Sequence, residues 1–191
     1  MTRRAVFMDR DGTISEEIGY VNHASRFRVF DYSAEAVLLL NDKEWLAVLV
    51  TNQAGVARGY FTENLIGEVH GILENDLRRS GARLDAIYYC PHHPIVGESP
   101  YRLDCECRKP KPGLILRAAD ELEIDLAESW MIGDRYSDMV LARQAGVHSA
   151  FVLSGYGRGE WEYQRATWTH QPDLVAENLL DAVRSIVAGQ S

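Results

Sequence analysis

Short apolar runs alternate with longer helix-like segments along this chain of 191 residues. Runs such as WLAVLVTNQ are continuously apolar, which is typical of strands buried on both faces of a parallel sheet. The alternation predicts an α/β class: a Rossmann-like, mostly parallel sheet with helices on both faces. We expect strands at Ala5–Asp9, Trp45–Gln53, Leu84–Cys90, Ser129–Asp134 and His148–Gly157, helices at Ser33–Glu44, Thr62–Gly81, Pro112–Glu123 and Arg135–Gly146, and a short strand and a last helix within Pro172–Gly189.

Carboxylates stand where the predicted strands end. Asp9 and Asp11 follow the first run, and Asp134 ends the run SWMIGD. Ligands of such sheets bind beyond the carboxyl ends of the strands, and side chains two residues apart in a strand point to the same side. Close carboxylates need a cation, and Mg²⁺ prefers oxygen ligands. The sequence therefore predicts a magnesium site at Asp9, Asp11 and Asp134.

A hydroxyl and several cations complete a set that suits a phosphoryl group. Thr51 ends the second predicted strand, and CRKPKPG supplies Arg108 and two candidate lysines, Lys109 and Lys111. With magnesium, these groups match the oxygens of a phosphate. Asp9 could then attack phosphorus, while Asp11 protonates the leaving oxygen and later deprotonates water.

All three cysteines lie in one loop. Cys90 and His92 form one pair of potential ligands, and Cys105 and Cys107 form a second. Three thiolates and one imidazole make a closed tetrahedral zinc set, which indicates a structural role. His93 competes with His92 for the imidazole position, although His92 has the more symmetric spacing.

The overall charge and hydropathy exclude some classes of protein. The formal net charge of −8 argues against a broad nucleic-acid or anionic-membrane surface. No apolar run approaches the roughly 20 residues of a membrane span, and no apolar signal region precedes the first strand. We expect residues 1–191 to form one cytoplasmic domain with a zinc loop at about 90–107. Our default expectation is a monomer that binds neither membranes nor nucleic acid.

Four segments, DRDGT, VTNQ, RKPKPG and GDRYSD, resemble the motifs of the haloacid dehalogenase superfamily of phosphatases. The resemblance implies Asp9 as nucleophile, Asp11 as general acid and base, and Thr51 and Lys109 as phosphoryl ligands; it favours Lys109 over Lys111. It also implies magnesium held by Asp9, Asp134 and the backbone carbonyl of Asp11. Asp138 would support the last of these motifs, GDRYSD, to which it belongs.

Longer segments narrow the resemblance to one subfamily. About forty residues separate Asp11 from Thr51, which leaves no room for a large cap domain. DRDGT…GYV, TNQAGVARG, YYCPHHP and CRKPKPG together resemble the heptose-1,7-bisphosphate 7-phosphatases, which serve the synthesis of nucleotide-activated heptose for bacterial surface polysaccharide. The resemblance implies a small sugar bisphosphate as substrate. Its implied binding residues are Gly19, Tyr20, Asn52, Gln53, Arg58 and Arg108.

Other functions share parts of this pattern. Histidinol-phosphate phosphatases combine the same motifs with a zinc loop and are the main alternative. Polynucleotide 3′-phosphatases share the TNQ…RG segment, but the acidic charge disfavours them. A phospho-accepting signalling domain would lack a base like Asp11. A zinc-binding interaction module would leave the carboxylates, the hydroxyl and the cations after the strands without a function. For the glycine-rich stretch Ser154–Trp161 we favour a connector.

Overall fold

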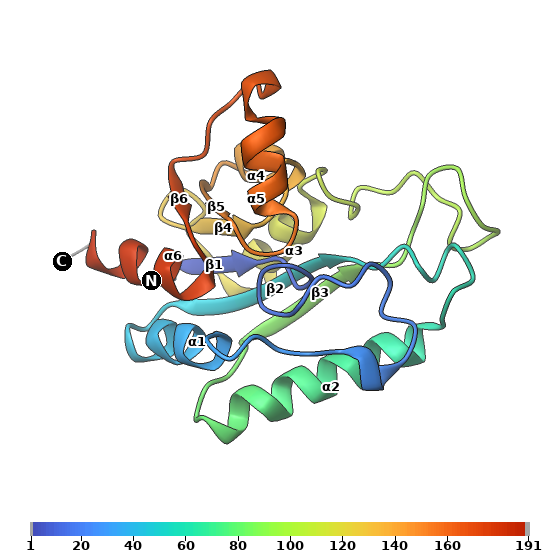
Figure 1. Ribbon diagram of the computed structural model, residues 1–191, viewed down its shortest axis with the longest axis horizontal. Helices are drawn as coiled ribbons and strands as arrows, with labels where there is room; N and C mark the ends of the chain where they lie inside the picture. Colours follow the sequence, from blue (N-terminus) through green and yellow to red (C-terminus); the bar gives the residue numbers. More distant parts are fainter. Residues whose placement is uncertain (1, 190–191) are drawn as a thin grey trace.

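The computed structural model describes residues 2–189, and a parallel six-stranded sheet forms the centre of this part of the chain. The strand order is β3-β2-β1-β4-β5-β6, so the first strand lies in the middle (Figure 1). Every neighbouring pair is parallel. The strands are β1 (Ala5–Met8), β2 (Leu46–Asn52), β3 (Ala86–Cys90), β4 (Trp130–Gly133), β5 (His148–Val152) and β6 (Leu174–Ala176).

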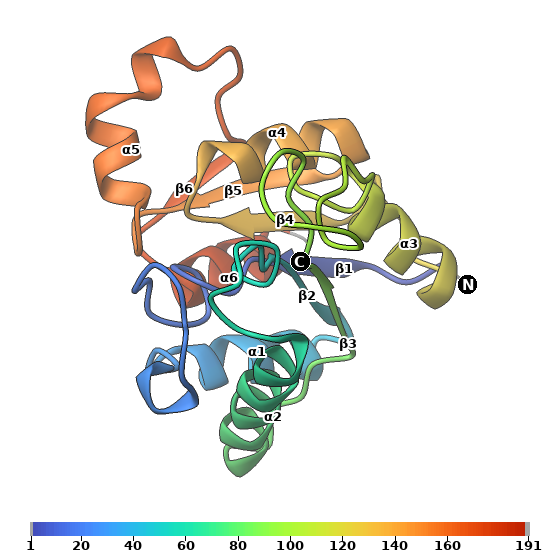
Figure 2. The same ribbon diagram turned by 90° about the vertical axis from the view of Figure 1, so that its right-hand side faces the viewer.

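Helices cover both faces of the sheet (Figure 2). α1 (Ser33–Asp42), α2 (Glu63–Arg79) and α6 (Leu179–Ala188) pack on one face, and α3 (Gly113–Leu122) and α4 (Tyr136–Ala145) pack on the other. β1 divides its side chains between the two layers, because successive residues of a strand point to opposite faces. Val6 and Met8 join the first core, whereas Ala5 and Phe7 join the second. The predicted α/β class is confirmed.

The termini of α1 and β5 differ from expectation. Ser33, the first residue of the expected helix, is buried, and its hydroxyl donates to the Ile14 carbonyl oxygen at 2.8 Å. The cap position belongs to Tyr32, whose side chain makes no capping bond. β5 ends at Val152, five residues before the end of the expected strand.

A helix not expected from the sequence follows β5. α5 (Gly157–Tyr163) and a 3₁₀ turn, η2 (Arg165–Thr167), project from the end of the sheet (Figure 2). Trp161 and Trp168 pack on Phe151 of β5, and these aromatic contacts hold the segment to the body of the protein. The glycines of this stretch had suggested a loop.

The connections at the carboxyl ends of the strands form the rim of the site. Between Asp11 and Thr51 the chain holds a loop, one short 3₁₀ turn, η1 (Ala24–Arg26), and α1, so no cap domain is inserted there. Among residues 2–189, no helix is both long and apolar enough to cross a membrane.

Candidate active site

A buried lysine joins two strand ends. Lys109 places its ammonium 2.8 Å from Asp9 Oδ1 and 2.9 Å from Asp138 Oδ1. Burial alone would lower the pKa of Lys109, but the Asp138 and Asp9 carboxylates outweigh it and raise the pKa. Lys109 is therefore charged. The other candidate, Lys111, is half-exposed and pairs with Asp104 and Glu106 at the surface, so the structure brings Lys109 alone of the two into the cluster.

Three carboxylates gather beside this lysine. Asp9, Asp134 and Asp138 each offer an oxygen, and these oxygens lie within 4.8 Å of one another. Burial, followed by the charges of Asp9 and Asp138, raises the pKa of Asp134 to about 8. Asp134 Oδ1 is buried without a hydrogen-bond partner, while Oδ2 accepts the Tyr156 backbone N–H at 2.8 Å. An orphaned carboxylate oxygen among like charges fits a hard dication such as Mg²⁺.

Gly12 allows the strand ends to approach this closely. Its φ is +83°, and a Cβ at this position would lie 2.1 Å from Asp134 Oδ2. A glycine therefore serves both the turn after β1 and the contact with the end of β4.

Asp11 does not belong to the three-carboxylate cluster, and its side chain has hydrogen-bond partners of its own. The guanidinium of Arg10 binds it through both oxygens, at 3.0 Å from Nε and 2.8 Å from Nη2. Gln53 Nε2 donates to Asp11 Oδ2 at 3.0 Å. Burial raises the pKa of Asp11, although the charge of Arg10 opposes this shift. A carboxyl group with a raised pKa suits a proton donor.

Gln53 also sets the orientation of the Thr51 hydroxyl. Gln53 Nε2 donates to Thr51 Oγ1 at 3.0 Å, so the hydroxyl accepts there and its own hydrogen is free to donate elsewhere. The Asn52 side chain binds the backbone of Lys109. Its Nδ2 donates to the Lys109 carbonyl and its Oδ1 accepts the Lys109 N–H, at 3.1 and 3.0 Å. The Asn52 side chain thus fixes the Lys109 backbone, and Asn52 also lines the cleft in which the resemblance implies contact with substrate.

A cleft of about 410 Å³ opens over these groups. Gly19, Tyr20 and Arg108 line it as expected, but Arg58 does not. Its lining also includes Arg135 and Tyr156, to which the sequence gave no role. The Arg135 guanidinium lies 4.1 Å from the centre of the Tyr156 ring. Tyr156 precedes α5, in the stretch expected to be a connector; its place after a strand of a parallel sheet was the signal that could have identified it.

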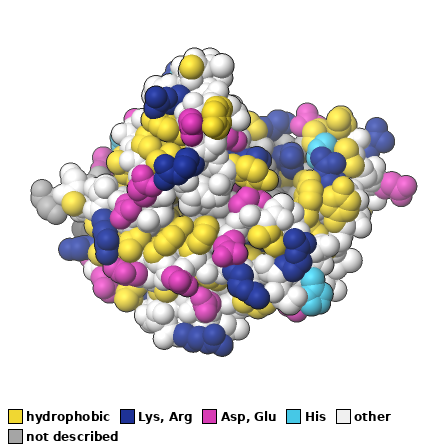
Figure 3. All heavy atoms as spheres, in the orientation of Figure 1, with side chains coloured by type: hydrophobic (Ala, Val, Ile, Leu, Met, Phe, Trp, Pro, Cys, Tyr) yellow, Lys and Arg dark blue, Asp and Glu magenta, His cyan; other side chains and the backbone are white. Residues whose placement is uncertain are grey.

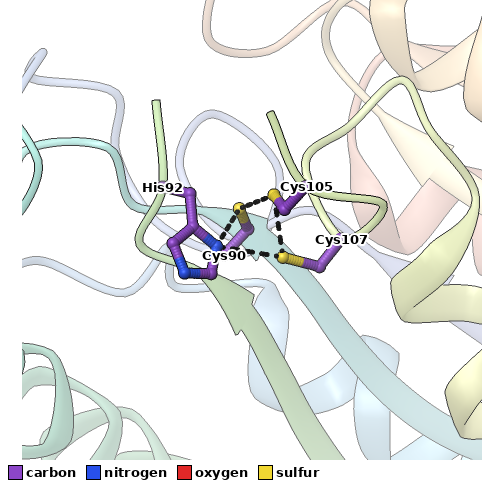
Figure 4. Close-up of side chains that lie close together, drawn as sticks. All are labelled: Cys90, His92, Cys105 and Cys107. Atoms are coloured by element: carbon purple, nitrogen blue, oxygen red, sulfur yellow. Dashed lines mark hydrogen bonds between the residues drawn. The ribbon is translucent and has the colours of Figure 1, made fainter. Parts of the chain in front are cut away.

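The four zinc-ligand candidates come together at the end of β3 (Figure 4). Cys90 Sγ lies 3.5 Å from Cys105 Sγ and 3.7 Å from His92 Nδ1. Cys107 Sγ lies 3.3 Å from His92 Nδ1 and 3.1 Å from Cys105 Sγ. Tetrahedral zinc with bonds of about 2.1–2.3 Å needs such separations. His93 is outside this set, and its ring faces Arg58 instead.

Comparison with known proteins agrees with this geometry. Residues 106–182 match a family model described as HAD-hydrolase-like. A D-glycero-β-D-manno-heptose-1,7-bisphosphate 7-phosphatase of Haemophilus ducreyi is 41% identical over 184 residues, which are 96% of this chain and 98% of the relative. One from Photorhabdus laumondii subsp. laumondii is 46% identical, over 95% of this chain and 94% of the relative.

A solved structure extends the likeness to the whole fold. The D,D-heptose 1,7-bisphosphate phosphatase of B. bronchiseptica, in complex with magnesium and phosphate, superposes with a TM-score of 0.86. Its sequence is 29% identical, and the alignment covers 97% of this chain and 99% of that one. From these relatives, this chain belongs to the D-glycero-β-D-manno-heptose-1,7-bisphosphate 7-phosphatase family of the HAD-like hydrolases.

Proposed function

We propose that this protein is a magnesium-dependent phosphatase that removes the 7-phosphate of D-glycero-D-manno-heptose 1,7-bisphosphate. The observation that carries the reaction class is the buried cluster of Asp9, Lys109, Asp134 and Asp138 at the strand ends. The relatives described above support the substrate, and the resemblance of the sequence motifs implies a place in the synthesis of nucleotide-activated heptose.

Phosphoryl transfer begins with the Asp9 carboxylate. One of its oxygens attacks phosphorus, the bond to the sugar oxygen breaks, and Asp11 gives its proton to that oxygen, which leaves as a hydroxyl group. An aspartyl phosphate remains. Asp11 then takes a proton from water, whose oxygen attacks phosphorus, and phosphate departs with the Asp9 carboxylate regenerated. The hydrogen bonds from Arg10 and Gln53 hold the Asp11 side chain in one orientation.

The charge on the phosphoryl group is met by this chain's cations and donors. The Lys109 ammonium and the free hydrogen of Thr51 are placed to bind its oxygens. Asp9, Asp134 and the Asp11 backbone carbonyl would hold Mg²⁺, which neutralises negative charge on the phosphate when bound. Asp138 accepts the Arg135 backbone N–H at the start of α4 and pairs with Lys109, so it acts by positioning that lysine.

Zinc would have a structural role at Cys90, His92, Cys105 and Cys107. The set is closed, because all four positions of a tetrahedron are filled by protein atoms. Cys107 stands two residues before Lys109, and Arg108 lies between them. The metal would therefore fix the loop that delivers both cations to the cleft.

Position-resolved phosphate release tests the proposal. Purified protein with Mg²⁺ is given heptose 1,7-bisphosphate, histidinol phosphate and 3′-phosphorylated DNA, and ³¹P NMR follows which phosphate is lost. We expect fast loss of the 7-phosphate alone, with the other two substrates slower by orders of magnitude in kcat/KM. Asp9→Asn should lose at least about a thousandfold in kcat with its fold retained. Preferred turnover of histidinol phosphate would overturn the substrate assignment.

A further inference from the structure

The loop that joins β3 to α3 leaves its large aliphatic side chains at the surface. Ile95 and Leu103 are 74% and 48% exposed, and Figure 3 shows hydrophobic side chains at the surface on the side of the molecule where this loop lies. A segment with few buried apolar contacts opens easily unless polar contacts or a metal hold it. The polar contacts of this loop therefore bear on how well it can hold zinc.

One carboxylate of α2 binds a tyrosine on each side of Cys90 and His92. Glu63, the first residue of α2, accepts hydrogen bonds from the Tyr89 hydroxyl at 2.6 Å and from the Tyr101 hydroxyl at 2.7 Å. These two bonds, with that of Tyr89 having the larger effect, lower the pKa of Glu63, so the acceptor is a charged carboxylate. Hydrogen bonds of this kind are short and roughly twice as strong as those between neutral groups. We call Glu63, Tyr89 and Tyr101 the tyrosine clamp.

The backbone connects both tyrosines to zinc-ligand candidates. Tyr89 directly precedes Cys90 in β3. The Tyr101 carbonyl oxygen accepts the His93 backbone N–H at 3.0 Å, and His93 directly follows His92. The tyrosine clamp therefore fixes the main chain before Cys90 and after His92.

The main chain of Cys90 is also connected to the active site. Its carbonyl oxygen accepts the Gln53 backbone N–H at 2.7 Å. The Gln53 side chain in turn binds the Asp11 carboxylate and the Thr51 hydroxyl. A shift of the main chain at the end of β3 would therefore move the residue that orients both groups.

We propose that Glu63 is a positioning residue of the zinc site, which it serves through Tyr89 and Tyr101. This inference rests on the zinc site of the proposed function. By fixing the main chain at Cys90 and His92, the tyrosine clamp reduces the ordering that metal binding would otherwise require, and so it slows the release of zinc. It acts on the reaction only through the metal.

Conservative substitutions separate the tyrosine clamp from other effects of Glu63. Glu63→Gln keeps the size of the side chain but removes its charge and one of its two acceptor atoms. Tyr101→Phe removes one hydroxyl and leaves the acidic residue at the start of α2, so it controls for the interaction of Glu63 with the helix dipole. Glu68→Gln, at an exposed position of the same helix, is the matched control.

The main measurement is the rate at which zinc-loaded protein releases zinc to an excess of the chromophoric chelator 4-(2-pyridylazo)resorcinol. We expect release about tenfold faster in Glu63→Gln, which is the effect typical of losing an outer partner of a metal ligand, and a smaller increase in Tyr101→Phe. Glu68→Gln should match the wild type. When kcat is measured against buffered free Zn²⁺, the curve of Glu63→Gln should shift about tenfold to higher zinc and reach the wild-type plateau.

The failures are distinguishable. If the wild type holds no zinc, the zinc site of the proposed function is overturned and the clamp with it. If the wild type holds zinc but both variants release it at the wild-type rate, the positioning role alone is overturned. The release measurement needs no substrate, so it decides this question even if the substrate assignment is wrong.

Two further results would contradict the positioning role. Faster release in Glu63→Gln but not in Tyr101→Phe would assign the effect to the charge at the start of α2. A loss of kcat in Glu63→Gln that excess zinc does not restore would show that Glu63 only stabilises the fold.

Discussion

Single buried side chains set the chemistry of this site. Arg10 is among the largest fully buried side chains in residues 2–189, and its guanidinium is satisfied by the carboxylate of Asp11. A buried charge is stable only when it is paired, so removing either partner leaves the other uncompensated. The residue between the two motif aspartates is therefore part of the machinery, because it orients Asp11.

His70 on α2 illustrates a buried group outside the cleft. It is buried, and its Nε2 has no hydrogen-bond partner. Burial, assisted by the charge of Arg10, lowers the pKa of His70 to about 3 from the usual 6.5. Between these values the unfolded chain binds a proton that the folded protein does not. The free energy of unfolding therefore falls as the pH drops below about 6.5, by up to ~1.4 kcal/mol per pH unit.

We expect His70→Gln to remove this acid sensitivity. Urea unfolding at pH 7.5 and pH 5 should show that the wild type loses about 2 kcal/mol more than the variant over this interval. The same substitution at exposed His148 should leave the wild-type loss unchanged. An equal loss in His70→Gln and the wild type would mean that His70 is protonated in the folded state.

A second prediction for a single residue concerns Gly12. In Gly12→Ala the new Cβ would displace the Asp134 carboxylate, which it would approach to 2.1 Å. We expect a higher Mg²⁺ requirement and a loss on the order of a hundredfold in kcat/KM, as follows from misplacing a catalytic group by about 1 Å. Gly146→Ala is the matched control, since φ is also positive there, at +74°, and nothing lies within 4 Å. It should lose stability only.

At the scale of elements, the loop between β3 and α3 holds three of the four zinc-ligand candidates as well as Lys109, to which we assign the binding of phosphate. We expect zinc removal by a chelator, or Cys107→Ser, to lower both the melting temperature and kcat. A displacement of Lys109 by about 1 Å would slow the reaction on the order of a hundredfold. Added zinc should restore the chelated wild type but not the serine variant; metal analysis and phosphate-release assays check both.

Lys111→Met is the control from the same loop. Lys111 pairs only with surface carboxylates among the described residues, so its loss should leave kcat unchanged. If Lys111→Met abolished activity while Cys107→Ser did not, the assignment of Lys109 and the role of the loop would both be wrong.

The strands and five of the helices were predictable because their signals are local. Continuous apolar runs mark β2 and β4, and Asp9, Thr51 and Asp134 follow directly from the rule that ligands lie at carboxyl ends. α5 was missed because its stability comes from tryptophan packing on β5 and not from a helical pattern. The clamp of Asn52 on Lys109 joins residues 57 positions apart, and no local pattern encodes such a contact.

At the scale of the whole molecule, the carboxylate cluster places like charges between β1 and β4. A cation bound there stabilises the folded state by mass action, by about 2.7 kcal/mol at a hundred times Kd. We expect Mg²⁺ to raise the melting temperature of the wild type. Asp134→Asn should not lower the melting temperature without Mg²⁺, because burial and the neighbouring carboxylates already disfavour a negative charge at this position, but it should abolish the rise with Mg²⁺.

Calorimetry with and without Mg²⁺ checks this prediction. Asp76→Asn, on the exposed side of α2, should keep the full shift. A full Mg²⁺ shift in Asp134→Asn would place the ion elsewhere.

The missing cap has a further consequence for how water is kept from the aspartyl phosphate. Many enzymes close a lid for this purpose, but between Asp11 and Thr51 this chain has only a loop, a 3₁₀ turn and α1 beside the cleft. The sugar of the substrate must then exclude water from the site. Generic aryl phosphates would leave the cleft open to water, so screening with them would underestimate the catalytic activity of this enzyme.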